Sequence, residues 1–390
     1  MLRFHTAGES HGQCLTAWVS GLPLGVAVDL GFINRELRRR QAGYGRGGRM
    51  KIERDEVHVL SGVRHGKTIG APLTLQIENK DWTHWEDSLP VEDKPVPPEK
   101  QRPLTEPRPG HADLAGALKF NLHDARYILE RASARETAAR VAAGAVAKLF
   151  LRSFGIEILS HTLAIGSARL ARQAKWEEIV AACEDTDAAI RCVDAAVGAE
   201  MKKLIERALA ERDSLGGVFE VVAHNVPPGL GSHAQWDEKL DARLAQAAMS
   251  IQAVKAVEIG SGVTNAAAFG SAVHDEINYD AGARRFTRPT NHAGGLEGGI
   301  TNGEDVVVRG YLKPISTLRR PLQSVDLVTK QPVKAAYERS DVCVVPAAGV
   351  IGEAMVALTL AAAAREKFGG DTLEEALRNF RAYQQQLKDF

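Results

Sequence analysis

Residues Ser133–Phe154 read SARETAARVAAGAVAKLFLRSF, an alanine-rich stretch in which apolar residues recur at helical spacing. Alanine has the highest intrinsic helix propensity, and the recurring apolar positions give such a helix a face to bury. We therefore predict a long helix over these residues. Its beginning allows two interpretations. Ser133 and Glu136 fit a capping box, whereas a positive helix end with Arg135 beside it is suited to bind an anion.

Helical and strand patterns are mixed along the whole chain. No proline- or serine-rich linker divides it, and no fixed-period repeat is visible. We therefore predict one intertwined α+β domain over residues 1–390, with mobile loops at about 41–51, 86–110 and 274–303. The expected helices, besides the first, lie near 29–41, 175–183, 196–213, 236–250, 352–368 and 371–388, and the expected strands near Leu15–Val19, Val57–Val63, Pro72–Ile77, 156–164, 217–224 and 304–311.

The composition is that of an ordinary soluble protein, with 44% hydrophobic and 25% charged residues. Lys plus Arg and Asp plus Glu number 49 each, so the net charge favours neither a nucleic acid nor a membrane as partner. No apolar run approaches the ~20 residues of a membrane helix, and no signal-peptide pattern opens the chain. The four cysteines have no CxxC spacing, which predicts reduced thiols, no metal site and a cytoplasmic protein.

Two histidines lie next to glycine in polar loops, His11 in Gly8–Gly12 (GESHG) and His111 in Pro109–Asp113 (PGHAD). Histidine exchanges protons near neutral pH, and glycine allows a ligand to approach the main chain. Taken alone, the loop Gly8–Gly12 is also compatible with a surface turn that precedes the first strand. The repetition favours a functional site that uses both histidines.

The segment Arg35–Arg54 carries a local excess of basic residues, which begins in an expected helix and continues into a Gly/Arg loop. The planar guanidinium of arginine binds carboxylate and phosphate in bidentate fashion, so this segment is suited to hold an anion. The alternatives are a solvated basic face or a segment that contacts RNA. RNA is disfavoured because the segment is short and Tyr44 is its only aromatic residue, which leaves little surface for stacking bases.

Two further stretches combine small and charged residues. Gly294–Gly303 lacks the spacing of a dinucleotide fold or a Walker loop, so it is either a main-chain cradle for a ligand or a structural hairpin. Arg339 and Asp341 are two residues apart, and on an extended segment they share one face. They form either one wall of a pocket or a surface salt bridge.

Three signatures occur in order along the chain: Gly8–Gly12 running to Gly21-Leu22-Pro23, Glu130–Thr137 running into Gly144-Ala145-Val146, and Arg339–Cys343 running to Glu353-Ala354-Met355. Between them lie the further stretches Arg46–Arg49, Arg108–Asp113, Met249–Lys255, Gly294–Gly303 and Lys313–Thr317. With these residues the chain resembles the chorismate synthase family along essentially its whole length. Trp18 and Gln252 differ from the residues usual in that family, which puts local packing and a flavin contact in question.

The resemblance implies a β-α-β sandwich, with central helices between antiparallel sheets. It also implies a lyase of the shikimate pathway that converts 5-enolpyruvylshikimate 3-phosphate to chorismate and phosphate by an anti-1,4 elimination. Reduced FMN is the implied cofactor, although the reaction has no net redox change. NADPH enters only indirectly, through reduction of the flavin.

The resemblance also implies roles for individual residues. His111 protonates the departing phosphate, His11 protonates or hydrogen-bonds the reduced flavin, and Asp341 helps flavin N5 accept the ring proton. Ser10 and Ser133 are further candidates for this proton relay, and no metal is implied. Assigned to the substrate anions are Arg40, Arg46, Arg49, Arg108, Arg135 and Arg339. Assigned to FMN are Ala132, Ser133, Ala134, Gln252, Ala253, Gly298, Lys313, Pro314, Ile315, Ser316, Thr317 and Arg339.

A homotetramer in the cytoplasm, supplied with reduced flavin from an external source, is the expected working form. Neither a nucleic acid nor a membrane is an expected partner. Two other functions remain open at this point. One is a flavin-dependent oxidoreductase that acts on a small anionic substrate, and the other is an RNA-binding protein that uses Arg35–Arg54.

Overall fold

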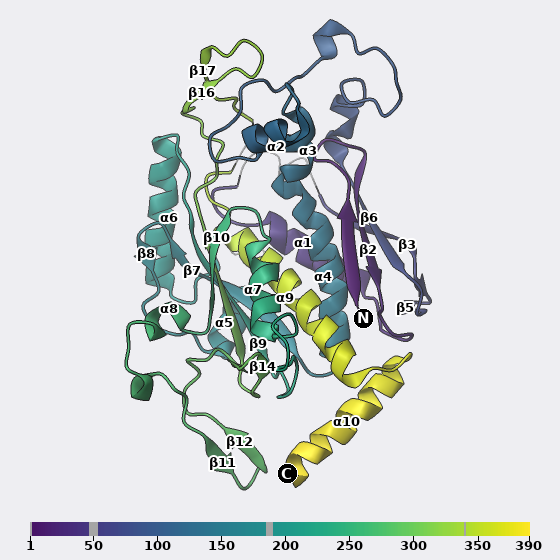
Figure 1. Ribbon diagram of the computed structural model, residues 1–390, viewed down its shortest axis with the longest axis vertical. Coiled ribbons are helices and arrows are strands. Elements are labelled where there is room, and N and C mark those ends of the chain that lie inside the picture. The colour runs from purple at the N-terminus through teal and green to yellow at the C-terminus, as the bar shows by residue number, and fades with distance from the viewer. Residues whose placement is uncertain (1, 47–53, 185–189, 339–340) are drawn as a thin grey trace.

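Two antiparallel sheets and several long helices form the framework of the computed structural model, which describes residues 2–46, 54–184, 190–338 and 341–390 (Figure 1). The first sheet has the order β1 (Arg3–Ala7), β2 (Cys14–Ser20), β6 (Leu73–Glu78) and β3 (Val57–Ser61). The second has the order β10 (Val254–Ile259), β15 (Val306–Leu312), β9 (Gly217–His224), β7 (Glu157–Ile165) and β8 (Ala168–Arg169). The chain is therefore a mixed helix and sheet protein.

The first sheet buries one face because its strands alternate. In β6, Leu73, Leu75 and Ile77 are buried, and the residues between them are half-buried or exposed. Residues one apart on a strand point to opposite faces, so this alternation orients the sheet toward the helices. The buried residues of β2 that pair with them are Leu15, Ala17 and Val19.

Long helices lie between the two sheets (Figure 1). The helix α4 (Thr137–Arg152) packs on β2 and β6, and α9 (Val345–Phe368) packs on β7 and β9. These two helices also pack along each other, with α1 (Leu30–Gln41) against both and α7 (Leu240–Met249) against α9. A Cβ on Gly144 of α4 would overlap Ala354 of α9. The close crossing of α4 and α9 therefore requires glycine at this position.

The remaining elements surround this framework. In Figure 1, α10 (Leu373–Asp389) extends away from the sheets at the C-terminal end. The other α-helices are α2 (Asp113–Phe120), α3 (Arg126–Ala132), α5 (Trp176–Glu184), α6 (Ala195–Ala210), α8 (Gly262–Asn265) and α10 (Leu373–Asp389). The short strands are β4 (Val63–Arg64), β5 (Lys67–Thr68), β11 (Asn278–Asp280), β12 (Arg285–Thr287), β13 (Leu296–Glu297), β14 (Ile300–Thr301), β16 (Gln323–Val325) and β17 (Pro332–Lys334), and the 3-10 turns are η2 (Lys80–His84), η3 (Pro98–Lys100), η4 (Ala134–Glu136) and η5 (Gly270–Ala272).

Each helix expected from the sequence is present, with shifted ends. The α9 helix begins at Val345 rather than near 352, because Pro346 in its first turn is compatible with a helix start. Of the two interpretations of the Ser133 region, the capping box with Glu136 is not formed, although Ser133 caps the 3-10 turn η4. The Ser133 hydroxyl accepts from the amide of Arg135 at 3.3 Å, while the Glu136 carboxylate bonds Thr6 and Arg140. The chain therefore enters α4 through a 3-10 turn.

Some elements were not predicted. They include β1, β10, α2 and α3, together with the short hairpins in the glycine-rich and polar segments. Within the Gly294–Gly303 stretch, β13 and β14 form a short hairpin. The segment 86–110 has one short 3-10 turn, and 274–303 contains two hairpins. The third expected loop, 41–51, lies partly outside the described residues.

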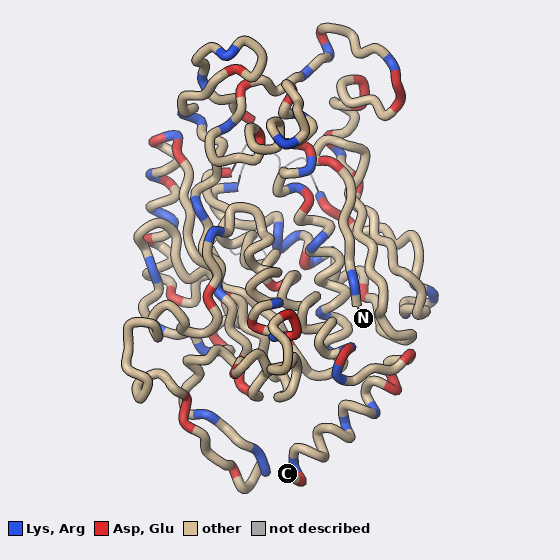
Figure 2. The backbone as a smooth tube through the Cα atoms, in the orientation of Figure 1, with Lys and Arg blue, Asp and Glu red and all other residues tan. Residues whose placement is uncertain are grey.

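Within the described residues, α9 is the one helix that is long and apolar enough to cross a membrane, and nearly all of it is buried inside the protein. Its composition is explained by its place in the core, because a helix covered on all sides is apolar all round. Figure 2 shows basic residues interspersed with acidic ones along the chain. Charged residues also occur in the core.

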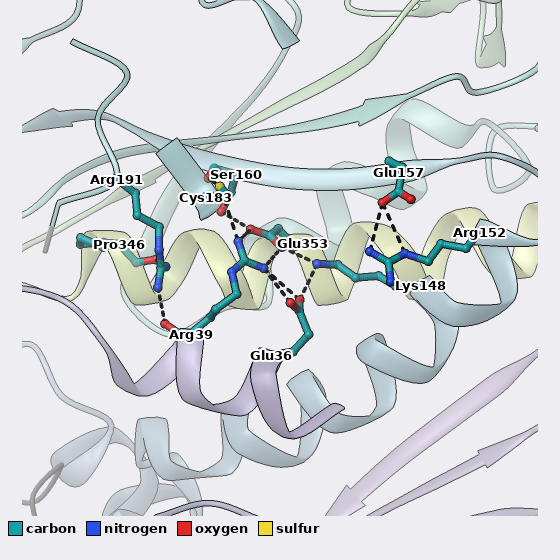
Figure 3. A network of polar contacts seen from close by, with 10 residues as sticks. All are labelled: Glu36, Arg39, Lys148, Arg152, Glu157, Ser160, Cys183, Arg191, Pro346 and Glu353. Atoms are coloured by element: carbon teal, nitrogen blue, oxygen red, sulfur yellow. Dashed lines mark hydrogen bonds and ion pairs between the residues drawn. The ribbon is translucent and has the colours of Figure 1, made fainter. Parts of the chain in front are cut away.

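A network of buried charges lies where α1, α4, α9 and β7 meet (Figure 3). At its centre, the Glu353 carboxylate of α9 accepts two hydrogen bonds of 2.8 Å from the Arg39 guanidinium and a further one from Lys148. Ser160 donates to the same carboxylate at 2.6 Å, and Glu36 lies 2.5 Å from the Lys148 ammonium. Burial raises the pKa of Glu353, but Arg39 and Lys148 outweigh it and hold the pKa below its ordinary value of 4.5.

We expect Glu353→Gln to destabilise the fold strongly. The substitution leaves the buried Arg39 and Lys148 short of one negative charge, and breaking a buried ion pair costs about 3–5 kcal/mol. The measurement is the urea midpoint of unfolding. The matched control is Glu366→Gln on the same helix, which removes a partly exposed partner of Arg243 and should cost no more than about 1 kcal/mol. Equal midpoints for the two variants would contradict this prediction.

Candidate active site

A cavity of about 540 Å³ opens beside the N-terminal ends of α4 and α9. Its walls come from segments that are far apart in the sequence, among them the loop between β1 and β2, the loop before α2 and the segment after β15. The cavity gathers most of the residues singled out in the sequence. Those that line it are Ser10, His11, Arg40, Arg46, Arg108, His111, Ala132, Ser133, Ala134, Arg135, Gln252, Ala253, Lys313, Ile315, Ser316, Thr317 and Asp341.

Four predicted residues are not among the cavity lining. Pro314 lies between two lining residues without lining the cavity itself. Gly298 is exposed in the turn between β13 and β14, and a Cβ there would meet no atom within 4 Å. Arg49 and Arg339 lie outside the described residues.

His11 is held on two sides. Its backbone N–H donates to Glu130 Oε2 at 2.7 Å, and its Nδ1 lies 2.8 Å from Glu130 Oε1. The imidazole also packs against Trp85, with ring centroids 4.2 Å apart. The guanidinium groups of Arg102 and Arg126 lie over the same Trp85 ring. The orientation of the His11 ring is therefore fixed by a carboxylate and an aromatic face.

His111 has a carboxylate partner of its own. Its Nδ1 lies 2.5 Å from Asp113 Oδ1, and Asp113 also receives the Arg108 guanidinium at 2.8 and 3.0 Å. Arg108 extends this chain to Thr317, whose hydroxyl lies 3.0 Å from Nη1. The side chain of Asp113 is fully buried, whereas that of His111 is 20% exposed. His111 is thus the accessible end of a buried polar chain.

Two arginines of the cavity share one buried carboxylate, that of Asp55. Arg40 Nη2 lies 2.6 Å from Oδ2, and Arg135 Nη1 lies 2.5 Å from Oδ1. Burial raises the pKa of Asp55, but the two guanidinium groups lower it by more than burial raises it. The net pKa lies below the ordinary value, so the carboxyl group stays ionised. Arg135 Nε also donates to Asn79 at 2.8 Å. Asp55 therefore holds two cations in place at the cavity wall.

Arg46 and Asp341 form an ion pair of 2.8 Å that joins the loop after α1 to the segment before α9. Both residues line the cavity and are mostly buried. The basic segment Arg35–Arg54 is therefore not a single exposed face, because Arg39 and Arg40 are also buried, each on a carboxylate. In the described part, these arginines point inward.

The wall that includes Ile251–Ala253 and Lys313–Thr317 differs in character. Much of it is apolar, with Ala347, Ala348 and Ile351 of α9 adding small and aliphatic side chains. Lys313 Nζ donates to Gly110 O and Ser316 Oγ, both at 2.9 Å. Burial and the nearby Lys255 lower the pKa of Lys313. This wall fits a flat apolar group with an anionic end.

Gln252 adds an unmatched acceptor to this wall. Its Nε2 donates to Glu136 at 3.2 Å, while its buried Oε1 has no hydrogen-bond partner among the described residues. A buried acceptor without a partner is costly, so a bound group with an N–H would complete it. The other departure from the family pattern, Trp18, lies on β2 and packs against His5 at 5.5 Å, outside the cavity lining.

Asp55, Trp85, Asp113 and Glu130 belong to the site but were not predicted from the sequence. Asp113 and Glu130 lie inside two of the signatures, close to His111 and Arg131 in the chain. Asp55 and Trp85 carry no such local signal, because their partners lie far away in the chain. No group of His, Cys, Asp and Glu that could hold a metal ion occurs in the part of the chain that the structure describes.

Comparison with known proteins gives one consistent result. The family model for chorismate synthase matches residues 2–364. Chorismate synthase of Solibacter usitatus (strain Ellin6076) is 62% identical over 390 residues, and this alignment covers 100% of both chains. Chorismate synthase of Aquifex aeolicus (strain VF5) is 52% identical over 396 residues, and the alignment covers 100% of this chain and 99% of the relative. A crystal structure of chorismate synthase has a TM-score of 0.80 at 43% identity and covers 100% of this chain and 99% of its own.

We expect Asp55→Asn to lower the melting temperature by several degrees, because Arg40 and Arg135 lose their shared counter-charge in the interior. Inorganic phosphate should restore part of this loss, since an anion that binds only the folded state stabilises it. The measurement is a thermal unfolding curve at increasing phosphate concentration. Asp241→Asn, at a half-buried position in the first turn of α7, is the control. An unchanged melting temperature, or a phosphate effect no larger than in the wild type, would contradict the prediction.

Proposed function

The chain belongs to the chorismate synthase family, and we propose that the cavity beside the N-terminal ends of α4 and α9 is its active site. Its function is that of a shikimate-pathway lyase, which converts 5-enolpyruvylshikimate 3-phosphate to chorismate and phosphate and requires reduced FMN. The observation that carries the site proposal is the convergence of His11, His111 and four arginines on one cavity. Family membership favours this lyase over the oxidoreductase and RNA-binding alternatives.

The fold proposal is the β-α-β sandwich of the family, built as one catalytic domain over residues 1–390. Its support is the placement of α4 against the first sheet, α9 against the second, and the two helices against each other. One hydrophobic cluster includes buried residues of both sheets and of the helices between them. A single core of this extent favours one domain over two.

The substrate carries two carboxylates and a phosphate, and the cavity offers cations to match. Arg40, Arg46, Arg108 and Arg135 are assigned to these anionic groups, together with Arg49 and Arg339 of the segments outside the described residues. Guanidinium groups bind carboxylate and phosphate through paired N–H donors. Because carboxylates already hold the four described arginines in place, little ordering is left for the substrate to induce.

The wall that includes Ile251–Ala253 and Lys313–Thr317 is assigned to FMN. Its apolar surface suits the flavin ring, the unmatched Gln252 Oε1 can accept from a ring N–H, and Lys313 with Ser316 and Thr317 can bind the phosphate. When bound, reduced FMN supplies an electron transiently to a reaction that has no net redox change. The protein orients it and excludes water. Ala132, Ser133, Ala134 and Arg339 complete the proposed contacts, and Gly298 belongs to them by family resemblance alone.

The elimination breaks the bond between a ring carbon and the phosphate oxygen and removes a ring proton. His111 is assigned as the acid that protonates the departing phosphate, which lowers the charge on the leaving group. Asp341, beside Arg46, is assigned to the proton that leaves the ring. His11 is assigned a proton or hydrogen bond toward the cofactor. Ser10 and Ser133 also line the cavity, with their hydroxyl oxygens 3.1 Å apart, and are assigned to a proton relay.

The working form we propose is a cytoplasmic homotetramer that receives reduced FMN from an external source. The support is family resemblance, together with a chain that aligns with its relatives from end to end. NADPH would then act only on the external source.

We expect His111→Ala and His11→Ala each to lower turnover ~10²–10³-fold while the fold survives, because each removes a group that handles a proton. The assay supplies reduced FMN and 5-enolpyruvylshikimate 3-phosphate under anaerobic conditions and follows chorismate absorbance and phosphate release. His58→Ala, on the exposed face of β3, is the control and should keep wild-type turnover. Wild-type rates in both site variants would overturn these assignments, and no product from the folded wild type would overturn the function.

Arg46→Ala should mainly weaken substrate binding. The variant loses a guanidinium from the anion site and leaves Asp341 without the ion pair at 2.8 Å, so an additional negative charge faces the substrate. The measurement is the Kd for 5-enolpyruvylshikimate 3-phosphate by calorimetry, with Arg64→Ala, an exposed arginine of β4, as control. An unchanged Kd would contradict the assignment of Arg46 to a substrate anion.

A further inference from the structure

We propose that Asp113 is a positioning residue, which fixes the tautomer and orientation of His111 so that Nε2 delivers the proton to the departing phosphate. The proposal rests on the acid role assigned to His111 in the proposed function. It adds a group that touches neither substrate nor cofactor, since Asp113 is fully buried and absent from the cavity lining. Asp113 is the first residue of α2.

The local chain geometry brings His111 and Asp113 together. Gly110 has φ +81°, and a Cβ there would lie 3.3 Å from Ser316 Oγ and 3.4 Å from Lys313 Nζ. Glycine therefore allows both the left-handed turn and the close approach of this loop to the Lys313–Thr317 segment. The turn is closed by the His111 N–H, which donates to Arg108 O at 3.1 Å. His111 faces the cavity from this turn, and Asp113 lies behind it.

Both oxygens of Asp113 are saturated with donors. Oδ2 accepts from the backbone N–H of Arg108 at 3.0 Å and from its Nε at 2.8 Å. Oδ1 accepts from Arg108 Nη2 at 3.0 Å and faces His111 Nδ1 at 2.5 Å. Burial raises the pKa of Asp113, but the hydrogen bonds from His111 and Arg108 outweigh it and hold the pKa well below its ordinary range. The side chain is therefore a carboxylate that only accepts hydrogen bonds.

An ionised carboxylate decides which imidazole nitrogen carries the permanent proton. Arg108 Nη2 also lies 3.0 Å from Nδ1, but a guanidinium cannot accept a proton, so the nearer Asp113 carboxylate is the partner to which Nδ1 donates. The proton therefore stays on Nδ1 throughout the reaction. The transferable proton is then the one on Nε2 of the charged ring. In the transfer, the Nε2–H bond breaks and an O–H bond forms on the phosphate oxygen, which receives the electron pair of the breaking C–O bond. His111 ends as the neutral Nδ1–H tautomer, still bonded to Asp113.

An asparagine at position 113 would invert this arrangement. Both partners of the Oδ2 position are Arg108 N–H groups, which cannot accept, whereas the Oδ1 position faces an imidazole nitrogen that can. The amide oxygen of Asn would therefore occupy the Oδ2 position, and its NH₂ group would face His111 Nδ1. That nitrogen would then have to accept, which leaves the proton on Nε2 of a neutral ring. A neutral imidazole is a poor acid, and the loss of the carboxylate also removes the charge that stabilises the imidazolium.

Asp113→Asn tests this inference in the full-length protein with reduced FMN. We expect kcat to fall ~10²–10³-fold, as for a lost general acid, with KM changed by less than about threefold. The double variant His111→Ala/Asp113→Asn should be no slower than His111→Ala alone, because Asp113 acts through His111. In ¹⁵N spectra of histidine-labelled protein, the His111 signals should change from the Nδ1–H to the Nε2–H pattern.

Asp124→Asn is the matched control. Asp124 also lies at the start of a helix, where Oδ1 accepts from the backbone N–H groups of Leu104 and Arg126. The hydrogen bonds of Asp124 that the structure describes go to the backbone and not to a histidine. The substitution therefore removes structural hydrogen bonds only, and turnover should stay at the wild-type level. Thermal unfolding of each variant establishes that it is folded under assay conditions.

Three results would overturn the proposal. One is wild-type kcat in Asp113→Asn. Another is a raised KM at unchanged kcat, which would mean that Asp113 serves binding through Arg108. The third is a double variant slower than His111→Ala by the full factor of Asp113→Asn, which would mean a purely structural role. Failure of the proposed function is distinct, because then His111→Ala itself retains wild-type turnover.

Discussion

The ion pair between Glu353 and Arg39 constrains much of the structure, because it joins α9 to α1 in the core. Each ion there loses its hydration, and this cost is offset only when every charge finds a partner at short range. Lys148 of α4 and Ser160 of β7 complete the network. Three helices and a strand are thus fixed in rotation by one set of contacts (Figure 3).

That rotation also determines the site. Arg39 points into the network, so Arg40, the next residue, is directed to Asp55 and the cavity wall. On α9, Ile351 lines the cavity two residues before Glu353. The same kind of interaction, a carboxylate that holds a basic side chain, recurs within the site at His11, His111 and the arginines. These groups are preorganised before a ligand arrives, and preorganised charges need no rearrangement during the reaction.

The sequence predicted the elements whose information is local. The α4 helix follows from alanine content and spacing. The α1 helix begins at Leu30, one residue after the expected start, and Asp29 caps it, since Asp29 Oδ1 accepts from Phe32 N at 3.1 Å. Loop histidines could be found because glycine and proline mark their loops. By contrast, Glu130 is 119 positions from His11, and Asp55 is 80 from Arg135. Such partners are set by tertiary packing, which residue spacing does not encode.

The basic segment Arg35–Arg54 illustrates why charge patterns along a sequence are ambiguous. Read alone, it is compatible with RNA binding, an exposed face or an anion site. In the structure, Arg39, Arg40 and Arg46 each meet a carboxylate from another segment, namely Glu353, Asp55 and Asp341. A buried arginine whose charge is balanced by a carboxylate attracts a polyanion at the surface only weakly. It still presents directed N–H donors to a small ligand in a cavity. Distant acidic residues, which no local pattern reveals, therefore convert a basic stretch into a selective anion site.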